Sequence, residues 1–342
     1  MTVNEYWQIL VSLYSIENIY FYKIYYGEFT LQREAIMCVC NQQSNSGKNM
    51  RLLPIIEAAI QKHDLPYAMQ DIAVPDLDQQ ILRFIEKNEN PVIIAAGGDG
   101  TFHSVANAFQ LIKLYSPTTQ LPAVAILPLG TGNDIAKSFG VPVGIKNVEE
   151  QVRIAIHGNI IDADLIKTDD KYFMDVFSIG IDTEILASRD HIMKNGFLKG
   201  YTAYAWAFLK TIFKCQSHQI NIKLDGAAVF NGKAYGVLVN NCEIHAGEFS
   251  LTPKASHTSG ELDLLIFDTK LRYLSHYLIG HRKLPPKYRH HQSPLYLQGK
   301  ATLMQFEEEL SYQLDGEVVG KVKDISLKIQ PGILKVCVPN KH

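Results

Sequence analysis

The sequence predicts a two-domain α/β protein: an N-terminal three-layer α/β domain with a parallel sheet, then a C-terminal, mainly antiparallel β-sandwich domain. Over residues 34–152, apolar runs of strand length alternate with glycine-bearing loops and segments of helical periodicity. This alternation is typical of parallel strands joined by crossover helices. Over residues 153–342, short apolar runs follow one another with turn residues between them. That spacing favours an antiparallel sandwich or barrel.

The first domain contains three strand signals and four helix signals in alternation. Its expected strands read "AIMCVC", "PVIIAA" and "AVAILPL", at 35–40, 91–96 and 123–129. Its expected helices span 50–63, 77–88, 103–114 and 135–140. Pro54 must lie in the first turn of its helix or kink it. Parallel sheets of this kind bind their ligands at the carboxyl ends of the strands.

The second domain shows eight short strand signals and one helical interruption. The expected strands lie at 159–168, 171–182, 218–226, 233–241, 260–268, 311–319, 324–330 and 334–339. The interruption, at 196–214, reads "GFLKGYTAYAWAFLKTIFK". The last residues of the chain could pack back on the first domain.

Composition and charge exclude some classes of protein. The net charge of -2 provides no overall attraction to nucleic acid. The five cysteines are scattered and no pair has zinc-site spacing, so we expect reduced core thiols in a cytoplasmic protein. They are Cys38, Cys40, Cys215, Cys242 and Cys337.

Residues 1–33 form an aromatic-rich extension. Its longest charge-free run, Tyr6 to Ile16, is about half the length of a membrane span. The extension has no basic segment followed by a small-residue cleavage site, so we do not expect a secretory signal. Three alternatives stay open: a helix packed on the body, an amphipathic helix at a membrane surface, and an extension with little structure.

Three glycine-bearing loops, at 41–48, 97–101 and 130–134, follow three strands of the first domain. Glycine lets backbone N–H groups approach a phosphate, and the helix that follows adds a positive dipole. The loops also carry hydroxyl donors: Ser44, Ser46, Thr101 and Thr131. Asp99 and Asp134 would repel a phosphate, so they indicate a bound cation or act as helix caps. The loops match neither a Walker A nor a Rossmann motif, so we expect a nucleotide without hydride chemistry.

The stretches "AAGGDGTFHSVAN" and "ILPLGTGNDIAKSFGVP" resemble the catalytic domain of the diacylglycerol kinase family, in its bacterial soluble lipid kinase branch. The resemblance extends from about residue 35 to the end. The first loop is similar to that family's Asn-Pro-x-Ser-Gly-x-Gly, with Gln42 and Asn45 in place of the proline and a glycine. The resemblance implies ATP- and Mg²⁺-dependent phosphorylation of a lipid hydroxyl, with ATP between the domains. The implied ATP-binding residues are Asn41, Ser44, Gly47, Gly97, Gly98, Asp99, Gly100, Thr101, Gly130, Thr131 and Asn133.

The motif "LDGE" resembles the family's late acidic motif, where the catalytic base has been placed. Asp315 and Glu317 are both candidates, and an extended backbone would point both to one face. The alternative for Asp315-Gly316 is a hairpin turn. For the metal, Asp99 and Asp134 would hold Mg²⁺ through water.

A second, structural magnesium site of the family is in doubt in this chain. The family often has Asp-Gly where this sequence has Ser259-Gly260, and a serine hydroxyl is a poor ligand for a hard cation. Backbone carbonyls near Ser256 and Glu261 are the remaining candidate ligands.

Between Thr269 and Phe306 the chain has seven lysines and arginines and no acidic residue. A polybasic surface is attracted to anionic lipid, so Lys283, Lys287 and Arg289 are candidates for contact with a membrane. The alternative is a solvated helix and loop face. We therefore expect a cytoplasmic protein with a lipid substrate, peripheral on the inner membrane face, which could form a homodimer through exposed strand edges.

Two other functions stay open. One is another kinase with a GGDGT motif, such as an NAD kinase, although "GTGND" argues against it. The other is a nucleotide- or lipid-binding protein that has lost catalysis, which the altered first loop and Ser259 leave possible. The sequence does not identify the acceptor lipid.

Overall fold

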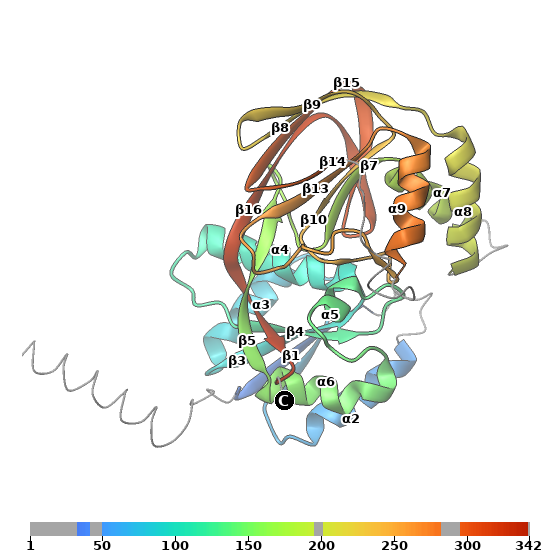
Figure 1. The fold of residues 1–342 in the computed structure, drawn as a ribbon. Helices are drawn as coiled ribbons and strands as arrows, with labels where there is room; N and C mark the ends of the chain where they lie inside the picture. The colour runs from blue at the N-terminus through green and yellow to red at the C-terminus, as the bar shows by residue number, and fades with distance from the viewer. Residues whose placement is uncertain (1–32, 42–49, 195–200, 282–294, 341–342) are drawn as a thin grey trace, which may run out of the picture. The chain divides into compact units, whose positions relative to one another are not determined.

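The computed structural model describes residues 33–41, 50–194, 201–281 and 295–340 (Figure 1). Residues 1–32, Ser44, Gly47, Lys283, Lys287 and Arg289 lie outside these ranges, and so do the expectations that concern them. Within them, no helix is both long and apolar enough to cross a bilayer. All five cysteines are free and buried, as expected of core thiols.

The first half of the chain is built on a parallel sheet with the strand order β2-β1-β3-β4. The strands are β1 (Ala35–Cys40), β2 (Tyr67–Asp71), β3 (Pro91–Gly97) and β4 (Ala123–Pro128). The sequence signals did not include β2. It is the edge strand, and all five of its residues are only half-buried, so its apolar run is interrupted.

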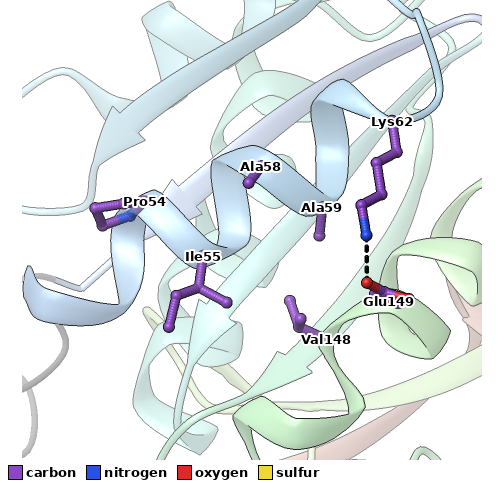
Figure 2. A pocket seen from close by; sticks show the side chains of 7 residues that line it. All are labelled: Pro54, Ile55, Ala58, Ala59, Lys62, Val148 and Glu149. Atoms are coloured by element: carbon purple, nitrogen blue, oxygen red, sulfur yellow. Dashed lines mark hydrogen bonds and ion pairs between the residues drawn. The ribbon is translucent and has the colours of Figure 1, made fainter.

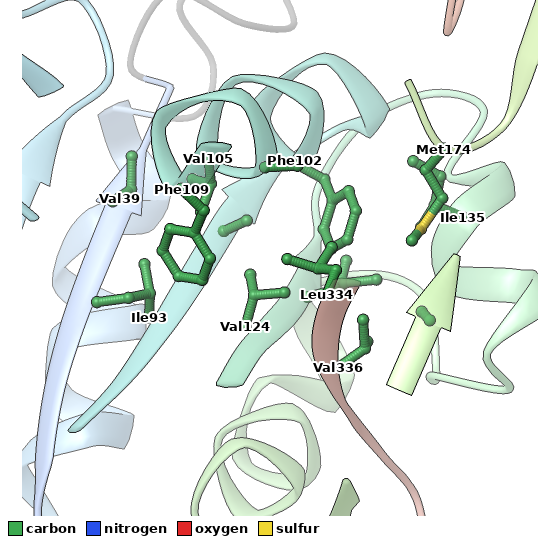
Figure 3. Close-up of a cluster of buried hydrophobic side chains, with 14 of the residues drawn as sticks. Val39, Ile93, Phe102, Val105, Phe109, Val124, Ile135, Met174, Leu334 and Val336 are labelled. Atoms are coloured by element: carbon green, nitrogen blue, oxygen red, sulfur yellow. The ribbon is translucent and has the colours of Figure 1, made fainter. Parts of the chain in front are cut away.

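Helices cover both faces of this sheet, which makes the three expected layers. Successive side chains of a strand point to opposite faces. Cys38 therefore packs toward α2 and α6, whereas Val39 packs toward α3 and α4 (Figure 3). The helices are α2 (Leu53–Gln61), α3 (Leu77–Lys87), α4 (Asp99–Tyr115), α5 (Asp134–Ser138) and α6 (Val148–His157), with the short 3₁₀ turn Ile145–Asn147 before α6. Pro54 lies in the first turn of α2, as expected.

The second half is mostly antiparallel. Its strands are β5 (Asn159–Lys167), β6 (Tyr172–Phe173), β7 (Val176–Gly180), β8 (His218–Leu224), β9 (Ala227–Ala234), β10 (Gly236–Asn240), β11 (Ile244–His245), β12 (Phe249–Ser250), β13 (Leu262–Phe267), β14 (Leu295–Gly299), β15 (Ala301–Leu314) and β16 (Glu317–Val338). The sequence signals missed β9 and β14, because both carry few buried residues, and also the short β11 and β12 and residues 301–310 of β15. They also split β16 in two, where Pro331 and Gly332 make an irregularity in one continuous strand.

Three helices cover part of the second half, where the sequence signals indicated one. They are α7 (Ile181–Lys194), α8 (Tyr201–Lys214) and α9 (Lys270–Gly280). Their inner faces pack with strand residues around Phe267 and Tyr273 into one buried cluster. In Figure 1 they stand together at the right of the sheet.

β16 connects the two halves. It pairs with β15 and β5, and near its end Val336 pairs in parallel with Val124 of β4. Leu334 and Val336 are buried in the cluster that also holds Phe102 of α4 (Figure 3). A single sheet therefore runs from β2 through β16 into the antiparallel strands.

A shallow pocket of about 360 Å³ lies between α2 and α6 (Figure 2). The ion pair between Lys62 and Glu149 borders it. α2 and α6 lie on the sheet face opposite α4. The pocket is therefore separate from the "GGDGT" and "GTGND" motifs at the ends of β3 and β4.

Candidate active site

The "GGDGT" stretch is a strand end and a helix start, and only Gly98 lies between them. β3 ends at Gly97 and α4 begins at Asp99, earlier than the predicted start at His103. The backbone N–H of Thr101 donates to the carbonyl of Gly98 over 3.0 Å. The prediction of a loop at 97–101 was therefore wrong, because the turn is compressed into one extended glycine.

The glycines of "GGDGT" and "GTGND" allow the two motifs to touch. A Cβ on Gly130 would lie 2.5 Å from the Cα of Gly98, which is too close for any real side chain. A Cβ on Gly98 would in turn lie 3.3 Å from the Cα of Gly130. Both motifs are thereby held at the carboxyl edge of the neighbouring strands β3 and β4.

Asn133 closes the "GTGND" turn. Its backbone is left-handed, with φ 53°, a conformation that asparagine tolerates better than most residues. Its Oδ1 accepts from the N–H of Gly130 over 2.9 Å, and its Nδ2 donates to the Gly130 carbonyl over 2.8 Å. Asn133 thus fixes the turn, while Thr131 stays exposed.

Asp99 links α4 to α5. Its Oδ2 accepts from the N–H of Asp134 and its Oδ1 from the N–H of Ile135, each over 3.1 Å. It therefore caps α5, which was one of the two roles considered for it. Burial, with the negative charges of Asp134 and Asp315, raises the pKa of Asp99 to about 7, although the two N–H bonds oppose the rise.

Asp134 is the better fit to a cation. Its carboxylate is buried, and in the described part of the chain its Oδ1 has no hydrogen-bond partner. Burial raises the pKa of Asp134, and the positive charges of His245 and Lys137 oppose that rise. A buried, unpartnered carboxylate oxygen beside a second carboxylate suits Mg²⁺, which prefers oxygen ligands and keeps several waters. Among the described residues no three acidic, histidine or cysteine side chains could hold a metal together, so water would complete such a site.

Asp315 occupies a hairpin turn, which was the alternative to an extended "LDGE". Leu314 pairs with Glu317, and both Asp315 and Gly316 have positive φ. The Asp315 carboxylate is buried and accepts from the N–H groups of Met174, Asp175 and Val176 over 2.9–3.2 Å. With three N–H donors on it, this carboxylate acts as an anchor for the start of β7.

Glu317 has a different environment two residues later. It is exposed, and its Oε1 would lie 2.7 Å from a Cβ on Gly100. Gly100 belongs to the first turn of α4, which carries Asp99. The carboxylate of Glu317 therefore faces the "GGDGT" stretch and remains accessible to a substrate.

His103 is a site residue that the sequence reasoning missed. Its Nδ1 lies 2.8 Å from Oδ2 of Asp315. Burial alone would lower the pKa of His103, but the hydrogen bond and charge of Asp315, helped by Glu317, outweigh burial and raise it. The available signal was spacing: Asp99, His103 and Asn107 recur every four residues and share one face of a helix.

The same helix face continues to Asn107. Its Nδ2 donates to the carbonyl of Tyr172 over 2.7 Å, and its Oδ1 accepts from the Tyr172 N–H over 2.9 Å. α4 therefore contacts the second half of the chain at two successive turns. A further contact joins Lys137 of α5 to the carbonyl of Gly247, over 2.7 Å.

A fourth carboxylate, Asp175, is buried beside the other three. Burial, together with the charges of Asp134, Asp315 and Asp99, raises the pKa of Asp175 well above its ordinary value. Four acidic side chains from both halves of the chain thus converge where α4, α5 and the "LDGE" turn meet. Like charges this near one another favour the protonated carboxyl, and a bound cation would oppose that effect.

Asn41 and Thr101, which were also predicted to bind ATP, lie in different surroundings. Asn41 follows β1, and its N–H donates to the carbonyl of Ala96 over 3.3 Å, so the first loop starts beside β3. Thr101 is buried with its hydroxyl against Gly97, which turns it away from solvent.

The predicted structural metal site does not fit the residues present. The hydroxyl of Ser259 donates to the carbonyl of Ser256 over 2.9 Å and lies 3.1 Å from that of Glu261. These are the two carbonyls that were candidate ligands, so the hydroxyl occupies the place of a cation. Asp164 holds the same loop by accepting from the N–H of Gly260 over 2.7 Å.

Two families match the chain in tandem. Residues 35–168 match the family described as "Diacylglycerol kinase catalytic domain". Residues 175–338 match the "YegS C-terminal NAD kinase beta sandwich-like domain". Together they include the two glycine motifs, His103, Asp175 and the "LDGE" turn.

Similar proteins agree with these matches. The chain is 26% identical over 303 residues to a diacylglycerol kinase of Staphylococcus saprophyticus, covering 86% of this chain and 93% of that protein. It is 26% identical over 233 residues to a diacylglycerol kinase of Bacillus subtilis, covering 68% and 73% of the two chains. A crystal structure of a diacylglycerol kinase from Bacillus anthracis matches the fold with a TM-score of 0.66 at 20% identity, covering 90% of this chain and 98% of that one.

Proposed function

Because the chain belongs to the diacylglycerol kinase catalytic-domain family and is a kinase, we propose that it transfers the γ-phosphoryl group of ATP to a hydroxyl of diacylglycerol or a related lipid. The observation that supports this most is the position of Glu317. An accessible carboxylate faces the first turn of α4, beside the buried acidic cluster of Asp99 and Asp134.

We propose Glu317 as the base and Asp315 as the residue that positions it. Asp315 already accepts three backbone N–H groups and contacts His103, so its oxygens are occupied. Glu317 is exposed and follows it across a two-residue turn. The rigid anchoring of Asp315 would hold Glu317 where an acceptor hydroxyl can reach it.

The proposed reaction is a single displacement. The oxygen of the lipid hydroxyl bonds to the γ-phosphorus, the bond from that phosphorus to the β–γ bridging oxygen breaks, and ADP leaves. The hydroxyl proton passes to Glu317. The "GGDGT" and "GTGND" backbones, with the loop after Asn41, would position the phosphates. When bound near Asp99 and Asp134, Mg²⁺ would offset the phosphate charge.

The test is transfer of radiolabel from ATP to a panel of diacylglycerol, sphingosine, undecaprenol and NAD. We expect Mg²⁺-dependent label in diacylglycerol or another lipid. We also expect Glu317→Gln to lower kcat by at least about 100-fold, the usual contribution of a general base, with ATP binding retained.

Asp315→Asn is the matched variant for the positioning role. It should lower thermal stability, because an amide cannot accept from all the N–H groups that the carboxylate serves. Label in NAD alone, or ATP binding with no transfer to any acceptor, would overturn the proposed function. Full activity in Glu317→Gln would overturn only the choice of base.

A further inference from the structure

α8 carries a row of large apolar side chains that face away from the protein. Trp206, Leu209 and Phe213 are 57%, 52% and 81% exposed. Their spacing of three and four residues puts them on one face of the helix. The opposite face is also apolar, and its Ala203 and Ala207 are fully buried against the body. α8 is therefore apolar on both sides, although among the described residues only Ala203, Ala207 and their neighbours on one side are buried.

α9 repeats this arrangement beside it. Leu271 and Leu278, two turns apart on the helix, are 75% and 72% exposed, while Tyr273 and Tyr277 point inward and are buried. The two helices are neighbours: Lys270 donates to the carbonyl of Phe213, and the rings of Phe208 and Tyr273 stack at 6.3 Å (Figure 1). We call the five exposed side chains the apolar surface: Trp206, Leu209, Phe213, Leu271 and Leu278.

The charges of the two helices have one sign. Neither α8 nor α9 contains an aspartate or a glutamate. Lys210 and Lys214 are exposed directly after Leu209 and Phe213, whereas Arg272, which follows Leu271, is paired with Asp268. Apolar side chains with lysines at their flanks, and no acidic residue, match the interface of an anionic bilayer, with acyl chains below a layer of negative headgroups.

We propose that the apolar surface of α8 and α9 docks the protein on an anionic phospholipid bilayer. The five side chains would enter the boundary between headgroups and acyl chains, and Lys210 and Lys214 would contact lipid phosphates. Five such side chains together exceed what scattered exposure on a soluble surface explains. The argument for docking does not depend on the proposed function. The proposed function supplies only the reason for docking, since a lipid acceptor resides in a membrane.

The inner face of α9 leads from this surface toward the candidate site. The Tyr277 ring lies edge-on to the His245 ring at 5.9 Å. His245 belongs to β11, which packs against α5 of the "GTGND" motif. A chain of packed side chains and elements therefore connects α9 with α5.

Trp206 provides a reporter inside the proposed contact. The chain has two tryptophans, Trp7 and Trp206, so Trp7→Phe leaves only the one on α8. With vesicles of phosphatidylcholine and 30% phosphatidylglycerol (roughly the anionic share that basic surfaces respond to), we expect Trp206 emission to shift to the blue. Lipids brominated in the acyl chain should quench it. Neither ATP nor an acceptor lipid is present, so failure of this test leaves the proposed kinase function unaffected.

Paired variants separate the surface from general hydrophobicity. Leu271→Ser with Leu278→Ser should reduce vesicle binding at least tenfold in flotation. Leu111→Ser with Leu114→Ser, which removes two leucines that are 50% and 78% exposed on α4, should leave it unchanged. Lys210→Gln with Lys214→Gln should weaken binding several-fold at low salt and less at high salt. Because all these side chains are exposed, circular dichroism melts should coincide.

Three results would overturn the proposal. One is vesicle binding with no change in Trp206 emission, which would place the contact elsewhere. Another is a dimer in light scattering that Leu271→Ser with Leu278→Ser dissolves, since a second copy would then cover the surface. The third is emission from the free, dilute protein that is already blue-shifted and indifferent to vesicles, since another segment of the chain would then cover Trp206.

Discussion

Asp315 joins the two halves of the chain through one carboxylate. It takes three backbone N–H groups at the start of β7 and one ring nitrogen from His103 on α4. The sequence indicated that Asp315 and Glu317 matter, because "LDGE" resembles a known motif. It did not indicate that the two residues do different things. That difference comes from a two-residue turn, which buries one carboxylate and exposes the other.

A prediction for a single residue concerns Asp263 on β13. Its carboxylate is buried and accepts from the hydroxyl of Tyr296. Burial raises the pKa of Asp263 to about 6, although Tyr296 and Gln298 oppose the rise. The folded state therefore holds a proton that the unfolded chain releases near pH 4. The contribution of Asp263 to the free energy of unfolding should fall by about 2 kcal/mol as pH rises from 4 to 6, and stay lower above that.

Asp263→Asn should make the fall smaller than in wild type by about 2 kcal/mol, because an amide does not titrate and still accepts from Tyr296. Urea unfolding at pH 4.5, 5.5 and 7 measures it. Asp324→Asn is the control, since Asp324 is exposed on β16. If wild type and Asp263→Asn lose stability in parallel over this range, the burial of a protonated Asp263 is refuted.

At the scale of elements, α4 organises the site. It begins one glycine after the end of β3. Three polar residues on one face of the helix contact α5, the "LDGE" turn and β6. Hydrophobic periodicity predicted this helix but started it four residues late, because glycines and aspartate disfavour helix interiors. It could not predict the partners of His103 and Asn107, since those lie in the other half of the sequence.

The contact between the two glycine motifs gives a prediction for this element. Gly130→Ala should separate the motifs, because its Cβ would meet backbone that cannot move aside. We expect a loss of about 1–3 kcal/mol in unfolding free energy and at least tenfold weaker ATP binding. Isothermal titration calorimetry and urea unfolding measure the two effects.

Gly132→Ala is the matched control in the same motif. Its Cβ would lie 3.4 Å or more from any neighbour, which is ordinary contact. Stability should change by less than about 0.5 kcal/mol. Equal losses in both variants would mean that the motif needs backbone freedom rather than close approach.

At the scale of the whole molecule, β16 makes one sheet of the two halves. The sequence predicted the fold type of each half, since the spacing of apolar residues differs between the α/β half and the antiparallel half. The strand itself appeared as separate short runs, because Pro331 and Gly332 interrupt the pattern. Pairing of its end with β4 depends on residues far apart in sequence, which periodicity does not record.

Leu334→Ala tests how far β16 couples the halves. Leu334 is 1% exposed in the core of the first half, so the substitution should cost about 2–4 kcal/mol. Amide hydrogen exchange should then accelerate by the same factor in β3 and in β13, because opening one half removes a strand of the other. Lys335→Ala, on the exposed side of the same strand, should leave both unchanged. Acceleration confined to β3 would show that the halves open separately.

The path of β16 also sets an order of assembly during synthesis. β4 emerges from the ribosome early, but the strand beside it contains Val336 and is made only after the entire antiparallel half. Until then, the edge of β4 and the apolar residues of α4 lack their cover. The first half of the chain should therefore remain a client of chaperones until β16 has been synthesised.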